Sequence, residues 1–349
     1  MAQKVRIGLI GAGNFSKLRM LPNFQRLGDV DLTMVANRGR ASAEKVAAEF
    51  EIAAVADDWR EVIESSDVDA VFIGTPPHVH HEMALAALAA GKHVLLQTRI
   101  AISAAEAREM HQKAQEARAR GVHAMLVPPN PFSKGRKFVK HLIDSGYLGK
   151  LRHAMGFNMS ASFADPKTPL SAGRNDPALY GPYNAGQLAL TYDAMTFWVG
   201  HATSLVAHRG WFVLERPATP DGPTIKNANP DEASVIADTT SGAIALNVLN
   251  WSVHFPESRI ELYGEEGTVT YRMRGDLIMA ARAGDQSLQE LPIPPEHDST
   301  WAVEDEFVRL IRGEIPEPSF TFWDGVKNME YVEAVYHSAV EGRRVDLPS

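Results

Sequence analysis

The sequence predicts an α/β protein of two domains, the first with a doubly wound parallel sheet and the second with a mostly antiparallel sheet. The first third of the chain alternates short apolar runs with segments of helical periodicity, which is typical of a parallel sheet covered on both faces. Further along, strand candidates follow one another with few helices between them. The length of 349 residues also exceeds one ordinary core, at about 150 residues per domain. We expect domains over residues 1–127 and 128–349.

Apolar runs bounded by glycine or proline are the predicted strands of the first domain. The run 4–11 ends in glycine, and the run 69–77 is stopped by two prolines. The helical segment 103–121 opens with Ser103 and Glu106 at the spacing of a capping box. The other predicted elements of this domain are strands over 31–38, 92–97 and 122–129 and helices over 14–27, 42–50 and 81–91.

Turn residues separate the strand candidates of the second domain. The segments DTTSGA (238–243) and GEEGT (264–268) have the composition of hairpin connections, which makes the neighbouring strands antiparallel. A segment rich in Pro, Asp and Asn, residues 215–232, is predicted to be a surface loop. Helices are expected over 186–200, 299–313 and 322–342, and the last is expected to pack back on the first domain.

Composition excludes several classes of protein. The net charge is -8 at pH 7 and the pI is near 5.9, with no basic stripe that would attract nucleic acid or an anionic membrane. The chain has no cysteine, which removes disulfides, thiolate nucleophiles and cysteine zinc sites. Its apolar runs are shorter than the ~20 residues that span a bilayer, and its N-terminus lacks the pattern of a signal peptide. We therefore expect a soluble, cytoplasmic protein with neither a nucleic-acid nor a membrane partner.

A glycine-rich turn joins the first predicted strand to the first helix. Within GLIGAGNFS (8–16), Gly11 and Gly13 form the G-x-G of a dinucleotide-binding fingerprint, where a side chain would obstruct the pyrophosphate. The amino end of the helix, at Asn14 and Phe15, is expected to present backbone N–H groups and the positive end of the helix dipole. Ser16 takes the third position of the fingerprint and is small enough for close helix–strand contact. The turn therefore predicts a dinucleotide coenzyme.

The end of the second predicted strand indicates which dinucleotide binds. A fingerprint of the NAD type has an acidic residue there, which accepts a hydrogen bond from the ribose 2′-hydroxyl. This strand instead ends in Asn37, Arg38, Gly39 and Arg40. Because an arginine can form a strong charged pair with a 2′-phosphate, Asn37 and Arg38 are candidate coenzyme ligands. NADP is the favoured coenzyme, and NAD is the alternative.

Three segments of the chain resemble the glucose–fructose oxidoreductase, inositol dehydrogenase and MocA (Gfo/Idh/MocA) family of NAD(P)-dependent oxidoreductases. They are GLIGAGNFSKLRM, TPPHVHHEMALAALAAGKHVLLQTRIA and LIDSGYLGKLRH. The resemblance implies a Rossmann domain followed by an α/β domain with a large open sheet. In this family that sheet often forms the interface of a homodimer or homotetramer, and the partner expected at the site is a small-molecule substrate.

The resemblance also implies roles for residues at the ends of two later strands. In the family, the residues of the pattern T-P-x-x-x-H lie against the nicotinamide ribose. They correspond here to Thr75, Pro76 and His80. The family's Glu-Lys-Pro tripeptide corresponds here to Gln97, Thr98 and Arg99. The lysine that binds the reacting hydroxyl and helps move its proton is therefore replaced by a threonine.

The second proton carrier of the family pattern is also replaced. A histidine three residues before an aspartate is expected on the helix that opens the second domain, and this chain has Leu190 three residues before Asp193. An arginine is not a proton acceptor, because its pKa exceeds ~12, so we expect Arg99 to bind an acidic or keto substrate. An ion pair of Arg99 with Asp176 or Asp193 is the alternative. The candidate proton carriers are Asp193 and Tyr183.

These observations predict an NAD(P)-dependent oxidoreductase that acts on the CH–OH group of a sugar-like or cyclic small molecule. The run HVHHE (78–82) has a spacing unsuited to three convergent ligands, so no metal site is expected. Two alternatives stay open. One is an isomerase or lyase that uses a tightly bound nicotinamide without net redox, and the other is an inactive NADP-binding member of the family.

Overall fold

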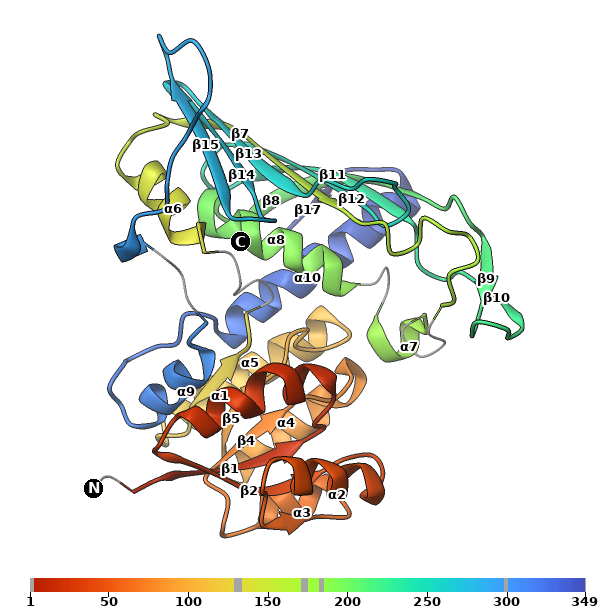
Figure 1. Ribbon diagram of the computed structural model, residues 1–349, viewed down its shortest axis with the longest axis vertical. Coiled ribbons are helices and arrows are strands. Elements are labelled where there is room, and N and C mark those ends of the chain that lie inside the picture. The colour runs from red at the N-terminus through yellow and green to blue at the C-terminus, as the bar shows by residue number, and fades with distance from the viewer. Residues whose placement is uncertain (1–2, 129–133, 171–174, 182–184, 298–300, 349) are drawn as a thin grey trace. The chain divides into compact units, whose positions relative to one another are not determined.

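The structure is a computed structural model that divides into two compact units (Figure 1). It describes residues 3–128, 134–170, 175–181, 185–297 and 301–348. Unit 1 comprises residues 1–128 and 302–329, and unit 2 comprises residues 129–301 and 330–349. The C-terminal helix α10 (Phe322–Glu341) therefore begins among the residues of unit 1 and ends among those of unit 2.

The sheet of unit 1 is parallel throughout its described strands, in the order β3-β2-β1-β4-β5-β6. Its strands are β1 (Val5–Ile10), β2 (Val30–Ala36), β3 (Ala54–Val55), β4 (Ala70–Ile73), β5 (His93–Leu96) and β6 (Ala124–Leu126). From β1 the chain adds strands toward one edge of the sheet, and from β4 it adds them toward the other edge. In such a sheet, ligands bind outside the carboxyl ends of the strands at the point where this order reverses, between β1 and β4. The predicted doubly wound parallel sheet is confirmed.

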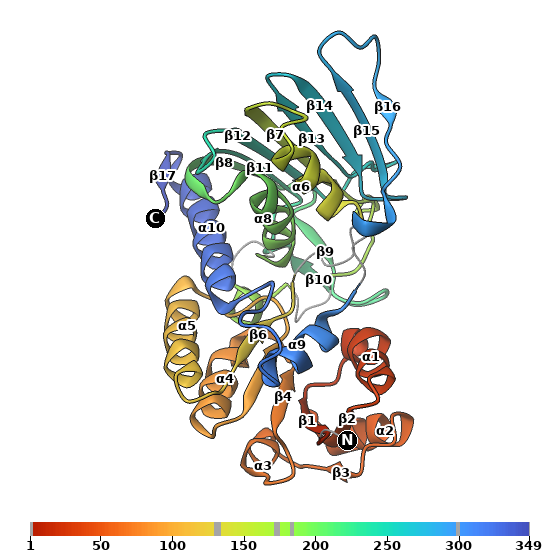
Figure 2. The same cartoon turned by 90° about the vertical axis from the view of Figure 1, so that its left-hand side faces the viewer.

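Apolar residues explain why these short segments form strands. All four residues of β4 and the last three of β5 are buried, as expected for strands covered on both faces. The helices of the unit are η1 (Ser16–Met20), α1 (Leu21–Arg26), α2 (Arg40–Glu49), α3 (Trp59–Glu64), η2 (Pro77–Val79), α4 (His80–Ala89), α5 (Ala104–Arg118) and α9 (Val303–Ile311). Figure 2 shows α4 and α5 side by side against the sheet. The predicted cap of α5 is confirmed, because the Ser103 hydroxyl accepts a hydrogen bond from the Glu106 amide.

The sheet of unit 2 is large and mostly antiparallel, as predicted. Its order among the described strands is β16-β15-β14-β13-β7-β12-β11-β8-β17, in which only β7 and β12 run parallel as neighbours. The bounds are β7 (Leu151–Met159), β8 (Ala202–Gly210), β11 (Glu232–Thr239), β12 (Ile244–Asn250), β13 (Arg259–Gly264), β14 (Gly267–Arg272), β15 (Leu277–Arg282), β16 (Gln289–Glu290) and β17 (Val345–Asp346).

Helices cover one face of this sheet. Figure 1 shows α6 (Arg136–Asp144) and α8 (Ala185–Val199) on that face. Alternate residues of β11 and β12 point to them and are buried, whereas the residues between are partly or largely exposed. The described part of unit 2 also contains α7 (Pro177–Tyr180) and η4 (Pro295–His297). No helix in the described parts of either unit is long and apolar enough to cross a membrane.

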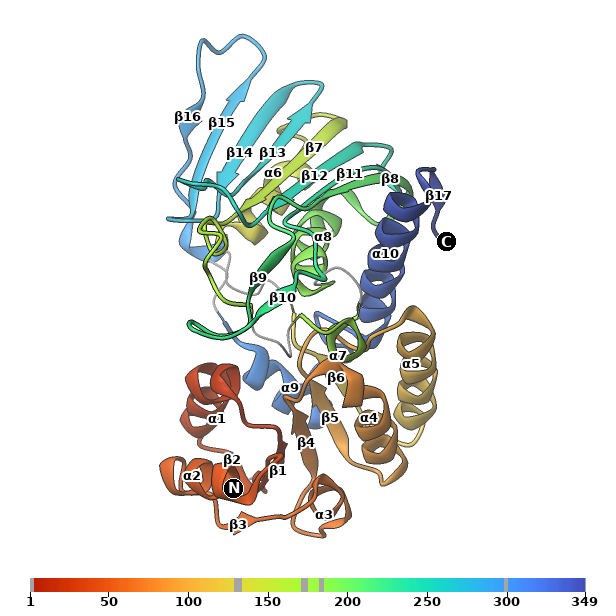
Figure 3. The same cartoon turned by 90° about the vertical axis from the view of Figure 1, so that its right-hand side faces the viewer.

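The segment predicted to be a surface loop, residues 215–232, is more ordered than its composition indicated. It forms the two-stranded ribbon of β9 (Glu215–Pro217) and β10 (Thr224–Lys226), seen in Figure 3, and then enters β11. The Arg216 guanidinium and the Asp231 carboxylate are buried within it. The prediction of a surface loop is therefore wrong in two respects: part of the segment forms strands, and the ion pair of Arg216 and Asp231 is buried.

Candidate functional site

The two glycines of the turn after β1 differ in their surroundings: Gly11 is tightly packed, whereas no described residue packs against the Cβ position of Gly13. Gly11 has φ +83°, and a Cβ there would lie 2.6 Å from Cγ2 of Thr75, so the residues of the chain itself require this glycine. A Cβ at Gly13 would meet no described heavy atom within 4 Å. The backbone at Gly13 is thus accessible to a ligand such as a pyrophosphate, which is how a dinucleotide-binding turn is used.

The turn after β4 packs against the glycine turn at the reversal of strand order. A Cβ on Gly74 would lie 2.7 Å from the Gly11 carbonyl oxygen and 2.9 Å from Oγ of Ser16. Ser16 is buried, so it provides the close helix–strand contact expected of the third fingerprint position. The sequence analysis did not single out Gly74, although its place directly after a buried strand and before Thr75 was a usable signal.

Asn37 holds the glycine turn in place from the end of β2. Its Oδ1 accepts a hydrogen bond from the Ala12 amide at 2.7 Å, and its Nδ2 donates to Oγ of Ser42 at 3.1 Å. The side chain predicted to contact the coenzyme is therefore also a structural part of the turn. Helix 14–26 begins directly after that turn, with Asn14 exposed and Phe15 partly buried.

The two arginines after β2 differ in their contacts. Arg40 forms ion pairs with Glu44 at 3.0 Å and with Asp57 at 2.6 Å, so protein carboxylates already occupy its guanidinium. The Arg38 side chain is exposed and has no ion pair with any described residue. Arg38 is thus the available cation at the end of β2.

His80 joins the carboxyl ends of β4 and β5 from inside unit 1. Its Nε2 lies 2.7 Å from the Thr75 carbonyl oxygen and its Nδ1 lies 2.8 Å from the Arg99 carbonyl oxygen. Burial lowers the pKa of His80 to about 4 against the opposing effect of these carbonyls, and the Arg99 charge lowers it further. The neutral ring carries one N–H and donates to one of these two carbonyls, so His80 lies within the turn that carries Thr75 and Pro76 rather than on the surface.

The Gln97–Thr98–Arg99 segment follows β5 at the same end of the sheet. The Gln97 amide donates to the Ile73 carbonyl at 2.9 Å, so this turn is tied to the end of β4. Gln97 and Thr98 are partly buried, Arg99 is 7% exposed, and the peptide between Thr98 and Arg99 is cis. Unit 1 therefore brings together the predicted residues of the glycine turn and of both later strand ends.

Asp193 belongs to unit 2, where it lies on α8 and is almost fully buried. Its carboxylate lies 3.4 Å from the guanidinium of Arg136, the first residue of α6. The sequence analysis missed Arg136, which is 57 residues away along the chain.

Tyr183, the other predicted proton carrier, lies outside the described residues. The carboxylate of Asp176, one proposed partner of Arg99, caps α7 by accepting from the Ala178 amide.

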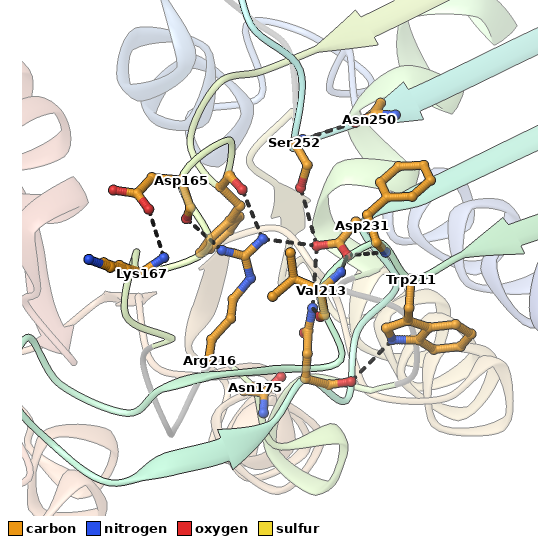
Figure 4. Close-up of polar contacts among 12 residues, drawn as sticks. Asp165, Lys167, Asn175, Trp211, Val213, Arg216, Asp231, Asn250 and Ser252 are labelled. Carbon is orange, nitrogen blue, oxygen red and sulfur yellow. Dashed lines mark hydrogen bonds and ion pairs between the residues drawn. The ribbon is translucent and has the colours of Figure 1, made fainter.

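A second buried charged cluster of unit 2 ties loops together (Figure 4). Arg216 donates to the carbonyl oxygens of Phe163 and Asp165, each at 2.8 Å, and pairs with Asp231 at 3.4 Å. The other Asp231 oxygen accepts from the amides of Phe212 and Val213, at 2.7 and 2.9 Å. The Arg216 and Asp231 side chains thus bond to main-chain groups at four places in unit 2, as in a structural centre.

The histidines of the HVHHE run do not converge in the structure. His80 is buried between carbonyls, whereas His81 lies 2.9 Å from Glu109 and His78 is exposed. No group of three or more His, Cys, Asp or Glu residues suited to a metal ion occurs among the described residues of the chain.

Comparison with known proteins identifies the family to which this arrangement belongs. Residues 5–124 match the model described as "Oxidoreductase family, NAD-binding Rossmann fold", and residues 137–270 match the "GFO/IDH/MocA C-terminal domain". The chain belongs to the Gfo/Idh/MocA family. It is therefore an oxidoreductase with an NAD-binding Rossmann domain, and the resemblance seen in the sequence is confirmed.

Relatives of this Gfo/Idh/MocA protein match along its full length. Levoglucosan dehydrogenase of Pseudarthrobacter phenanthrenivorans is 24% identical and matches over 99% of each chain. A solved oxidoreductase domain protein of Kribbella flavida is 25% identical, with a TM-score of 0.87 and complete coverage of both chains. A solved levoglucosan dehydrogenase in complex with NADH and levoglucosan has the same fold, with a TM-score of 0.87 at 23% identity, covering 99% of this chain and 100% of that one.

Proposed function

We propose that the protein transfers a hydride between NADP and a hydroxyl-bearing carbon of a sugar-like or cyclic small molecule. The open backbone at Gly13, beside a turn fixed by Asn37, carries the proposal, because it is a place where a pyrophosphate can approach main-chain N–H groups. The coenzyme, when bound, accepts or supplies the hydride. The substrate class follows from a curated relative named levoglucosan dehydrogenase.

Two glycine substitutions test this placement as a matched pair. Gly13→Ala adds a methyl group where the protein leaves room, so it should weaken NADPH binding about tenfold or more while stability changes by less than about 0.5 kcal/mol. Gly11→Ala meets Thr75 at positive φ, so it should cost about 2 kcal/mol of folding stability. Fluorescence titration with NADPH and urea unfolding measure the two effects. Unchanged NADPH affinity in Gly13→Ala would place the coenzyme elsewhere.

Arg38 carries the preference for NADP within this proposal. Both arginines at the end of β2 are exposed, but Arg38 has no ion pair with a described residue, whereas Arg40 is already paired with two carboxylates. Arg38→Asp should reduce the NADPH to NADH affinity ratio by about tenfold to a hundredfold, since it replaces a phosphate-binding charge with a repelling one. Arg40→Gln is the control and should leave the NADPH to NADH affinity ratio unchanged. An affinity ratio that Arg38→Asp leaves unaltered would favour NAD as the coenzyme.

Asp193 is the proposed acceptor of the substrate hydroxyl proton, with Tyr183 as the other candidate. In the oxidising direction the carbon loses a hydride, the hydroxyl loses a proton to the Asp193 carboxylate, and a carbonyl forms. Asp193→Asn should therefore lower kcat by about a hundredfold or more with NADPH affinity preserved.

Arg99, at the carboxyl end of β5, is proposed to bind an oxygen atom of the substrate. Arg99→Ala should therefore raise KM for the substrate far more than it changes the affinity for NADPH.

A panel of levoglucosan, L-sorbose and cyclic diols, assayed for NADPH formation and consumption, tests the reaction itself. Turnover of any member supports the dehydrogenase. Coenzyme that stays bound through purification, with substrate rearranged and no net NADPH, would indicate the isomerase or lyase instead. Tight NADPH binding with no conversion would indicate an inactive member of the family.

The outer face of the sheet in unit 2 is proposed to form a homodimer or homotetramer interface. Val206, Ile236, Leu246 and Met155 are register neighbours across four strands on this face, and Val206 and Ile236 are about half exposed. An apolar row of this kind favours burial against a second copy. The double variant Val206→Asp and Ile236→Asp should be a monomer in sedimentation velocity, and an unchanged assembly would reject this face.

A further inference from the structure

The Arg136 guanidinium contacts both the Asp193 carboxylate and the Phe197 ring. One guanidinium nitrogen lies 3.4 Å from each carboxylate oxygen, and the guanidinium carbon lies 4.2 Å from the centre of the Phe197 ring. Phe197 and Asp193 are four residues apart on α8, so they present one face of that helix to Arg136. The cation is therefore confined in two directions, by a carboxylate and by an aromatic face.

The backbone that carries Arg136 is fixed by three side chains. The Tyr271 hydroxyl accepts from the Gly135 amide at 3.2 Å, and Asp276 accepts from the Lys134 amide at 3.0 Å. The Trp198 indole donates to the Arg136 carbonyl at 3.1 Å. Gly135 is packed so closely that a Cβ would lie 2.8 Å from Cδ1 of Ile278. The start of α6 is thus held at one place against α8 and the sheet.

The Arg136 guanidinium is not fully used by these contacts. Its side chain is 18% exposed, and its Nε is buried without a hydrogen-bond partner among the described residues, as is the Nε of Arg216. A structural arginine of this unit, Arg216, is fully buried and donates to two main-chain carbonyls in addition to its carboxylate. Arg136 makes no such main-chain bond with its guanidinium among the described residues. Its one charged partner in that part of the chain is Asp193.

We propose that Arg136 is a positioning residue for Asp193: it orients the carboxylate that accepts the substrate hydroxyl proton. This inference rests on the proposed function and deepens it, because it names a residue that acts through the proton carrier. In the oxidising direction, the hydroxyl proton would pass to a carboxylate oxygen of Asp193, and the hydride would pass from the carbon that bears the hydroxyl to a bound oxidised coenzyme.

Arg136→Gln and Arg136→Lys test the role with levoglucosan and NADP as the assay pair, or with the panel member that the parent turns over fastest. Arg136→Gln should lower kcat about tenfold to a hundredfold while KM for NADP stays within about twofold. Arg136→Lys keeps the charge and should recover most of kcat. In the Asp193→Asn background, Arg136→Gln should have little further effect, because the two residues act as a unit.

A matched control exists on the other face of the sheet. Arg259 pairs with Glu261 at 2.6 Å and lies 4.3 Å over the Phe157 ring, so Arg259→Gln removes a similar ion pair and stacking contact away from α8. Its kcat should equal that of the parent, with the assembly checked by sedimentation. Thermal shifts of each variant with NADPH give a second readout that does not depend on turnover, and Arg136→Gln should show the parent's shift.

The outcomes separate the two proposals. If Asp193→Asn keeps full activity, the proposed role of Asp193 is wrong and the role of Arg136 fails with it. If Asp193→Asn loses activity but Arg136→Gln keeps it, only the positioning role is overturned. A loss in Arg136→Gln that Arg136→Lys fails to restore, accompanied by a lower melting temperature and a lost NADPH shift, would show that Arg136 merely supports the fold.

Discussion

Two arginine–aspartate pairs of unit 2 have similar separation but different surroundings. Arg136–Asp193 and Arg216–Asp231 both span 3.4 Å, and both aspartate side chains are 3% exposed. The Arg216 pair is completed by main-chain carbonyls on the cation and main-chain amides on the anion. The Arg136 guanidinium contacts a carboxylate and a ring. The comparison teaches that distance and burial alone do not distinguish the two pairs, and that main-chain carbonyls accept hydrogen bonds from the guanidinium in only one of them, as far as the described residues show.

The largest expected effect is on the Arg216 cluster. Asp231→Ala leaves a buried guanidinium without its counter-charge and frees the amides of Phe212 and Val213, so it should lower the free energy of unfolding by about 3–5 kcal/mol. Urea unfolding followed by circular dichroism measures this. Asp193→Asn is the comparison and should lose activity with a much smaller change in stability. If both variants lost stability equally, the two pairs would not differ as we describe.

His80 extends the comparison to unit 1, since it is another buried centre whose polar atoms face the main chain. Its pKa is lowered to about 4 by burial, so the folded protein binds fewer protons than the unfolded chain between about pH 6.5 and pH 4. Its contribution to stability is therefore complete above pH 6.5 and falls, by about 3 kcal/mol, as the pH drops to 4.

Comparing the parent with His80→Gln isolates this contribution, because the other titrating groups are common to both proteins. The free energy of unfolding of His80→Gln should depend less steeply on pH across that window. Parallel curves for the two proteins would mean that His80 does not stay neutral in the fold.

The smallest expected effect comes from exchanging arginine for lysine in each pair. Lysine keeps the charge but not the planar fork, so Arg216→Lys should cost about 1–2 kcal/mol by losing hydrogen bonds to the carbonyls of Phe163 and Asp165. Arg136→Lys gives up no guanidinium bond to a described main-chain carbonyl and should cost less than about 1 kcal/mol. Thermal unfolding of the two variants side by side tests the ranking, and a reversed order would contradict it.

Local signals were sufficient to predict the fold and the coenzyme turn. The alternation of apolar runs and helices predicts the parallel sheet. The glycine turn was predicted from the spacing of Gly11, Gly13 and Ser16 within one short stretch, although two of these residues pack against the distant turn after β4. The charged contacts of unit 2 could not be found in this way. Arg136 reaches Asp193 across 57 residues, and Arg216 reaches the carbonyl of Asp165 across 51, through packing that no short window encodes. The segment 215–232 therefore has the composition of a loop but contains a buried cation.

The amide of Asn37 has a consequence for engineering coenzyme choice. The amide oxygen already accepts from the Ala12 N–H and the amide nitrogen already donates to the Ser42 hydroxyl, so replacing Asn37 with an acidic residue would disturb the glycine turn itself. Arg38 is adjacent, exposed and outside this small network. If Arg38 selects the coenzyme as we propose, the preference between NAD and NADP could be changed at this one surface position while the glycine turn keeps its shape.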